Sequence, residues 1–201
     1  VMFLLVHAGC NFMMLVGAEA YNEVCEFMAT NPIIKVVEPI LALGFAIHII
    51  YAFILSVQNR KSRGNDRYAV VDQSKSSKWA SRNMLVLGVI LLCILGLHLA
   101  TIWAKVKGLC EGLPTTADGG EDVYALVVAN FQSWQCFVYV ILAVALFMHL
   151  SHGFWSAFQT IGWSNDVWRK RLTCIGKIYA VIVCGIFAIV PIFFYILQFC
   201  K

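Results

Sequence analysis

The sequence predicts an all-α integral membrane protein built from five transmembrane helices. Hydrophobic residues make up 61% of the 201 residues and charged residues only 13%, whereas about a quarter of the residues in a soluble protein are charged. The charged residues are also clustered, so that long stretches of the chain carry none. Because a helix needs roughly 20 mostly apolar residues to cross the hydrocarbon core, several of these stretches are long enough to span a membrane.

The five spans are expected at residues 1–18, 36–58, 83–105, 123–160 and 172–199, within one transmembrane domain that covers residues 1–201. Pro191 lies inside the fifth span and is expected to kink it, which neighbouring helices in a bundle tolerate. The first span opens without Met and is barely long enough, so we expect the native chain to begin further upstream. A cleaved signal peptide is the competing interpretation of that span, but the segment lacks the basic flank and the small-residue cleavage pattern of such peptides.

The charges of the connections between the spans predict the orientation in the membrane. Of the fifteen Lys and Arg residues, eleven lie in the second and fourth connections, and eight of the eleven Asp and Glu residues lie in the first and third. Basic connections stay cytoplasmic, so we expect a cytoplasmic N-terminus and a periplasmic C-terminus. The same bias accounts for the net charge of +4 without a nucleic-acid partner. The basic residues are Arg60, Lys61, Arg63, Arg67, Lys75, Lys78, Arg82, Arg169, Lys170, Arg171 and Lys177, and the acidic ones are Glu19, Glu23, Glu26, Glu38, Glu111, Asp118, Glu121 and Asp122.

All five histidines lie within the predicted spans. The first three spans contain His7, His48 and His98, and the fourth contains His149 and His152. Ionisable groups at membrane depth are costly and usually face the bundle interior for a functional reason. One such histidine could equally make an interhelical hydrogen bond, but four successive helices that each supply one predict paired metal ligands. Two imidazoles from facing helices can bind one haem iron, so four of the helices are expected to form a bundle that holds two haems stacked across the bilayer.

The surrounding residues indicate which kind of metal site this is. None of the eight cysteines belongs to a Cys-x-x-Cys-His motif, which attaches haem covalently, so two non-covalent b-type haems are expected. Zinc could use the same histidines, but no acid or Cys lies nearby on the same helix faces. Gly44 shares a face with His48, and Gly153 shares one with His149. These glycines leave room for a porphyrin edge, although ordinary packing of small residues between helices would explain them equally well.

Several segments together resemble one known family. The segment HLSHGFWSAFQTIG (149–162) is similar to the fourth helix of the dihaem cytochrome b subunit of succinate:quinone oxidoreductases and quinol:fumarate reductases. The segments GAEAYN (17–22), HIIYAF (48–53), QNRK (58–61) and WASRNM (79–84) resemble the same subunit. The similarity covers essentially the whole chain, and it looks closest to the subunits of Bacteroides-like bacteria.

This resemblance implies a function, partners and a location. It implies the membrane anchor of a succinate dehydrogenase or fumarate reductase in the bacterial inner membrane, with two haem b groups that transfer electrons between menaquinone and an iron–sulfur subunit. It also implies a flavoprotein subunit that carries FAD and performs the dicarboxylate chemistry, with both soluble subunits on the cytoplasmic side. The direction of the reaction stays open, as does the pairing of complexes into dimers.

The resemblance further implies which histidines bind the haem irons. The ligands of the four helices match His7, His48, His98 and His149, with His152 as the alternative on the fourth helix. In the family the first and third helices hold the haem distal to the soluble subunits, and the second and fourth hold the proximal one. One departure concerns Phe147, which stands where some fumarate reductases of this family have a proton-returning glutamate. A carboxylate relay at that position is therefore not expected.

The quinone is expected to react near the outer end of the bundle, by the distal haem. A quinol must release two protons as its electrons leave, and a carboxylate at the membrane surface can accept them. Two neighbouring polar side chains could hydrogen-bond a quinone carbonyl, although the same residues could simply form a solvated outer loop. The candidates are the proton acceptors Glu19, Glu23 and Glu26 and the hydrogen-bonding residues Tyr21 and Asn22.

Two rival interpretations remain at this point. Another multi-helix cytochrome b, such as a hydrogenase or formate dehydrogenase subunit, would also place histidine pairs in the membrane, but more often with two ligands on one helix. A haem-free transporter or structural anchor is the rival from a different class of protein. A visible absorption spectrum of the purified protein distinguishes the second rival at once.

Overall fold

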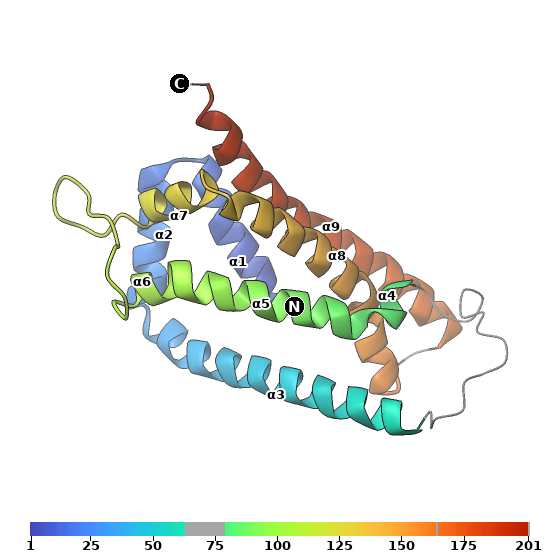
Figure 1. Ribbon diagram of the computed structural model, residues 1–201. Helices are drawn as coiled ribbons and strands as arrows, with labels where there is room; N and C mark the ends of the chain where they lie inside the picture. Colours follow the sequence, from blue (N-terminus) through green and yellow to red (C-terminus); the bar gives the residue numbers. More distant parts are fainter. Residues whose placement is uncertain (63–78, 164, 201) are drawn as a thin grey trace.

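The computed structural model describes residues 1–62, 79–163 and 165–200, and these residues form helices joined by turns (Figure 1). The one β-type pairing in these ranges is an isolated bridge between Thr115 and Glu121. In chain order the elements are α1 (Met2–Phe12), the 3₁₀ turn η1 (Met13–Leu15), α2 (Ala18–Thr30), α3 (Pro32–Ser62), α4 (Trp79–Arg82), α5 (Met84–His98), the π-helical turn η2 (Leu99–Trp103), α6 (Ala104–Val106), α7 (Val123–Phe131), α8 (Gln135–Thr160) and α9 (Asp166–Leu197).

Four helices in the described part of the chain are long and apolar enough to cross a membrane, which makes this a multi-pass membrane protein. They are Pro32–Ser62, Met84–Val106, Gln135–Thr160 and Asp166–Leu197. The predicted first span is a shorter apolar helix, Met2–Leu15, which ends in a turn at Gly17 with φ of 151°. The Val1 carbonyl accepts a 2.6 Å hydrogen bond from the Tyr179 hydroxyl, so this helix starts beside the middle part of α9 and not at either of its ends. The count of five spans therefore stays a prediction.

The predicted fourth span, 123–160, is wrong in its extent because the helix breaks at residues 132–134. Ser133 Oγ donates to the Asn130 carbonyl over 2.6 Å and accepts from the Gln135 backbone N–H over 3.2 Å. A serine side chain that bonds to the backbone in this way competes with the helical pattern. The run therefore consists of two helices, α7 and α8, of which α8 alone is long enough to span.

Local signals explain the other helix boundaries that differ from the prediction. The fifth span was expected from residue 172, but α9 begins at Asp166, because the Asn165 side chain caps it by accepting from the Trp168 N–H over 2.8 Å. The helix continues past Pro191 to Leu197. The second span was expected from residue 36, but α3 begins with Pro32, at the position where helices tolerate proline best. Residues 18–30, in the first connection, form the helix α2.

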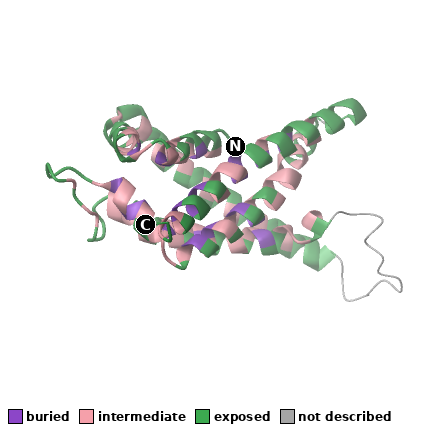
Figure 2. Cartoon of the chain, turned by 90° about the horizontal axis from the view of Figure 1, so that it is seen from above, coloured by how far each residue is buried: buried purple, intermediate pink, exposed green. Residues whose placement is uncertain are grey.

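The helices differ in how tightly they pack. α8 and α9 run along each other, and a Cβ added at Gly176 would lie 2.8 Å from the Phe154 ring, so the two backbones approach closely at this glycine. α1 packs on α9 and α5 packs on α8. In contrast, α3 has no buried residue over its 31 residues. Large apolar side chains are exposed along α3, α8 and α9, as lipid-facing surfaces require. Figure 2 shows that exposed residues are spread over most of the helices.

Opposite charges gather at the two ends of the bundle. One end carries the basic C-terminus of α3, the short helix α4 and the first turns of α9, and the other carries α2 and the connection before α7 (Figure 1). The basic residues at the first end are Arg60, Lys61, Arg82, Arg169, Lys170 and Arg171, and the acidic residues at the second are Glu19, Glu23, Glu26, Glu111, Asp118, Glu121 and Asp122. Arg63, Arg67, Lys75 and Lys78 of the predicted second connection lie outside the described residues.

Candidate metal centres

The first histidine pair joins α1 to α5. The ring centroids of His7 and His98 lie 5.8 Å apart, with an angle of 74° between the ring planes, and both side chains are half-buried. Phe3 stacks on His7 at 5.3 Å, and Phe187 of α9 lies 5.6 Å from it. The apolar rings around His7 keep water from one side of the pair.

The second pair joins α3 to α8. The ring centroids of His48 and His149 lie 6.2 Å apart, with an interplanar angle of 81°. His48 is exposed on the inner side of α3, whereas His149 is half-buried and its Nδ1 is buried without a hydrogen-bond partner among the described residues. An unsatisfied buried nitrogen costs about 1–3 kcal/mol, so the His149 site favours a further polar or metal partner.

The alternative fourth-helix ligand is placed differently. The His152 ring meets Trp155 of the same helix at 5.3 Å, and Trp155 in turn holds the Arg169 guanidinium 5.1 Å from its ring centroid. Among the described ring contacts, the His48 ring lies next to the ring of His149 and not next to that of His152.

Both pairs fit the geometry of two imidazoles on opposite sides of one metal ion. Metal–nitrogen bonds of about 2 Å to each ring place the two ring centroids about 6 Å apart, close to the observed 5.8 and 6.2 Å. The donor set also fits haem, because the porphyrin supplies four further nitrogens and the protein needs to supply only two. No group of three or more His, Cys, Asp or Glu suited to a metal ion occurs in the described ranges, whereas a structural zinc site takes four protein ligands.

The glycines beside the ligands leave space in the structure. A Cβ added at Gly44 would meet nothing within 4 Å, and one added at Gly153 would meet only the Met84 Cε at 3.9 Å. Both glycines were singled out because each shares a helix face with a histidine. The open space at Gly44 agrees with the exposure of His48 on the same helix, and it leaves the inner side of α3 available to a flat group.

The quinone candidates on α2 fall into two sets. Glu19, Glu23 and Glu26 are exposed, which matches both a proton-accepting role and a plain solvated face. Tyr21 and Asn22 instead have structural contacts. Asn22 Nδ2 donates to Asp122 Oδ1 over 3.1 Å, and Asn22 Oδ1 accepts from the Tyr124 backbone N–H over 2.9 Å.

Tyr21 belongs to the apolar core at the acidic end of the bundle. Its side chain is buried, packs with Met14 and Phe194, and lies 6.3 Å from the Tyr124 ring. Burial raises the pKa of the Tyr21 hydroxyl, and the neighbouring Cys25 raises it further. The hydroxyl is therefore a hydrogen-bonding group and not a proton acceptor.

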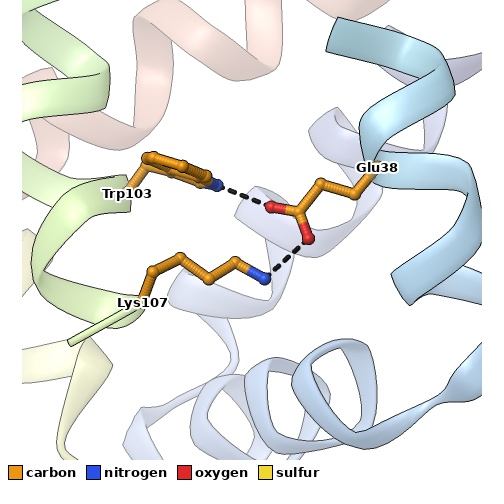
Figure 3. Close-up of polar contacts among 3 residues, drawn as sticks. All are labelled: Glu38, Trp103 and Lys107. Atoms are coloured by element: carbon orange, nitrogen blue, oxygen red, sulfur yellow. Dashed lines mark hydrogen bonds and ion pairs between the residues drawn. The ribbon is translucent and has the colours of Figure 1, made fainter. Parts of the chain in front are cut away.

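The structure adds polar contacts that sequence reasoning missed. Glu38 of α3 accepts a 2.7 Å hydrogen bond from Trp103 Nε1 and forms a 2.7 Å ion pair with Lys107 Nζ (Figure 3). The partners are 65 and 69 residues away in the chain, and no local pattern links them. An acid beside Pro39 at the start of a long apolar run was the one available signal. Tyr139, whose hydroxyl lies 3.4 Å from His98 Nδ1, was also missed.

Comparisons with protein-family models, with curated proteins and with solved structures find no match for this chain.

Proposed function

We propose that the chain is the dihaem cytochrome b membrane-anchor subunit of a succinate:menaquinone oxidoreductase or quinol:fumarate reductase. The observation that carries the proposal is the pairing of four histidines from four different helices, His7 with His98 and His48 with His149, at the spacing of axial ligands. His98 lies in the last turns before the acidic end, whereas His149 lies beyond the middle of α8 towards the basic end. Two haems held by these pairs would stack across the membrane.

Each part of the bundle has a role in this proposal. A bound haem supplies one-electron transfer, and its potential depends on the axial ligands, on burial and on nearby charge. The four histidines would hold the irons, and Phe3 and Phe187 exclude water from the His7 side. The basic end is the docking surface for the iron–sulfur subunit and the FAD-containing flavoprotein, which carries out the dicarboxylate chemistry. Since basic connections stay cytoplasmic, this end faces the cytoplasm of a bacterial inner membrane, with the C-terminus of α9 at the periplasmic side.

The first prediction concerns the haem content of the purified chain. We expect a pyridine haemochrome assay to give two b-type haems per chain, all extractable by acid–acetone, because four ligands are available and no covalent attachment motif exists. In the purified complex, free of other dehydrogenases, succinate should reduce these haems, whereas hydrogen or formate should not. A chain without haem would support the transporter or anchor interpretation, and reduction by formate or hydrogen would support the other cytochrome b class.

The second prediction concerns the quinone site, which we place at the acidic end beside the His7–His98 pair. Replacing Glu19, Glu23 or Glu26 with Gln removes a carboxylate that can accept a quinol proton. We expect haem content to stay at two in each variant and quinone-linked turnover to fall about a hundredfold or more in at least one, because general base catalysis contributes about 10²–10⁴-fold. Tyr21 and Asn22 would have to give up their contacts with the core and α7 to bind a quinone carbonyl, so the proton-accepting carboxylates are the sharper test.

Glu111→Gln is the matched control, because this residue is exposed in the other acidic connection. Turnover measured with a menaquinone analogue should be unchanged in the control. If all three α2 variants keep full turnover, the carboxylate assignment fails. If a bound inhibitor lies beside His48 and His149 instead, the placement of the quinone at the acidic end fails as well.

A further inference from the structure

Tyr139 connects α8 to the histidine at the end of α5. Its hydroxyl oxygen lies 3.4 Å from His98 Nδ1, and the two rings meet edge to face with centroids 6.2 Å apart. The Tyr139 side chain is 7% exposed and is held from the other side by Phe131, whose ring lies 5.2 Å away. The hydroxyl is thus fixed by the core and has little freedom to turn away from His98.

The chemistry of a metal-binding histidine indicates what this contact does. An imidazole that binds a metal through Nε2 carries its proton on Nδ1, and this N–H donates a hydrogen bond to a nearby oxygen. The hydrogen bond fixes the tautomer and the ring orientation, and it makes the imidazole more basic. A tyrosine oxygen can accept such a proton when its own O–H points elsewhere. At this position the phenol oxygen is the acceptor that His98 Nδ1 reaches.

A second hydroxyl lies near Tyr139. It belongs to Thr101, and it donates to the Leu97 carbonyl over 2.8 Å. With its proton engaged there, Thr101 Oγ1 can accept the Tyr139 proton, which leaves a phenol lone pair for His98. Thr101 lies in the π-helical turn η2, which starts directly after His98, and such turns often occur at functional sites.

His149 and His7 have no comparable partner among the described residues. His149 Nδ1 is buried without a hydrogen bond, and the contact of His7 is a 3.4 Å approach of its Nε2 to the Asn11 amide nitrogen on its own helix. Among the described residues, a partner at Nδ1 from a neighbouring helix is therefore seen for His98 and not for His149.

We infer that Tyr139 is a positioning residue for His98. The Tyr139 oxygen accepts a hydrogen bond from His98 Nδ1–H, and this hydrogen bond lowers the reduction potential of the haem that His7 and His98 would bind. This inference rests on the proposed function. A more basic imidazole favours the oxidised iron, so the loss of the acceptor should make that haem easier to reduce. The effect should be confined to one of the two haems.

The test is Tyr139→Phe in the haem-loaded chain, which keeps the ring and its contact with Phe131 and removes the oxygen. We expect two haems per chain, an upward shift in the midpoint potential of one haem in a redox titration, and a change in the EPR g values of the same haem alone. Tyr195→Phe is the matched control, because the Tyr195 ring contacts Phe137 and Phe199. It should shift neither haem.

Thr101→Val is the second variant and keeps the inference testable if Tyr139→Phe loses haem. It retains both rings and removes a hydroxyl oxygen near Tyr139 that can accept the phenol proton, so the same haem should shift in the same direction by a smaller amount. Unchanged potentials in both variants, or equal shifts of the two haems, would overturn the role of Tyr139 while leaving the dihaem assignment intact. A wild-type chain without haem would instead overturn the proposed function.

Discussion

Replacing any one of His7, His48, His98 and His149 with alanine is expected to lower the haem content from two per chain to one. Each haem iron in the proposed arrangement has two protein ligands on different helices, and truncating either ligand leaves one axial position without its imidazole. The two variants of a pair should lose the same haem, so that His7→Ala and His98→Ala leave one residual spectrum and His48→Ala and His149→Ala leave the other. Haemochrome content, redox titration and EPR of the remaining haem measure this directly.

His152→Ala is the matched control for the fourth helix. The His152 ring packs against Trp155, and its removal should leave two haems with unchanged EPR signals. If His152→Ala loses a haem and His149→Ala keeps both, the fourth-helix ligand is His152. If every single variant loses both haems, the division into two independent pairs is wrong, since each pair should hold its iron without the other.

The membrane character and most helices followed from composition and length, but the inner boundaries depended on single side chains. An uncharged run of apolar residues predicts a helix, because the hydrocarbon core requires every backbone group to be bonded within the chain. That argument cannot locate the break at residues 132–134, where one serine hydroxyl takes over the backbone bonding of Asn130 and Gln135. The predicted fourth span was too long for this reason.

The histidine pairs of the candidate site were predictable at the level of residue type and only partly at the level of geometry. Histidines in four apolar segments indicated paired ligands, and the family resemblance implied that the first helix pairs with the third and the second with the fourth. The structure brings together those two pairs. The partners around them were not predictable, because Tyr139 reaches His98 across 41 residues of sequence and nothing local distinguishes it from other aromatic residues.

The contact that holds α3 in the bundle could not be predicted either, because its residues are far apart in the sequence. This helix carries His48 but buries none of its residues, so apolar packing within the chain does little to fix its register. Among the described residues, the side-chain hydrogen bonds that join α3 to another helix of the bundle are those of Glu38 with Trp103 and Lys107 (Figure 3). Trp103 ends the π-helical turn that follows His98. The same span thus carries His98 of the first pair and the contact that anchors the helix carrying His48.

Glu38→Ala is therefore expected to weaken the His48–His149 haem site selectively. Hydrogen bonds to a charged group contribute about 1.5–3 kcal/mol, but both side chains of the ion pair are about a third exposed, at 34% and 32%. Solvent screening reduces such a contribution to about 1 kcal/mol, which corresponds to roughly fivefold weaker haem retention. Titration of haem into apoprotein, followed by redox and EPR assignment of the bound haem, measures the loss at each site.

Graded variants separate the anchoring role of Glu38 from a general loss of stability. Glu38→Gln keeps an oxygen for Trp103 and removes the ion pair, so its effect should lie between those of the wild type and Glu38→Ala. Lys107→Met should resemble Glu38→Gln, because both remove the charge pair, and Lys105→Met should have no effect, because Lys105 takes no part in the Glu38 contacts. Since His7 and His98 lie on α1 and α5, their haem should be retained in every variant. Equal loss of both haems in Glu38→Ala would show that the contact supports the whole bundle and does not set the position of His48.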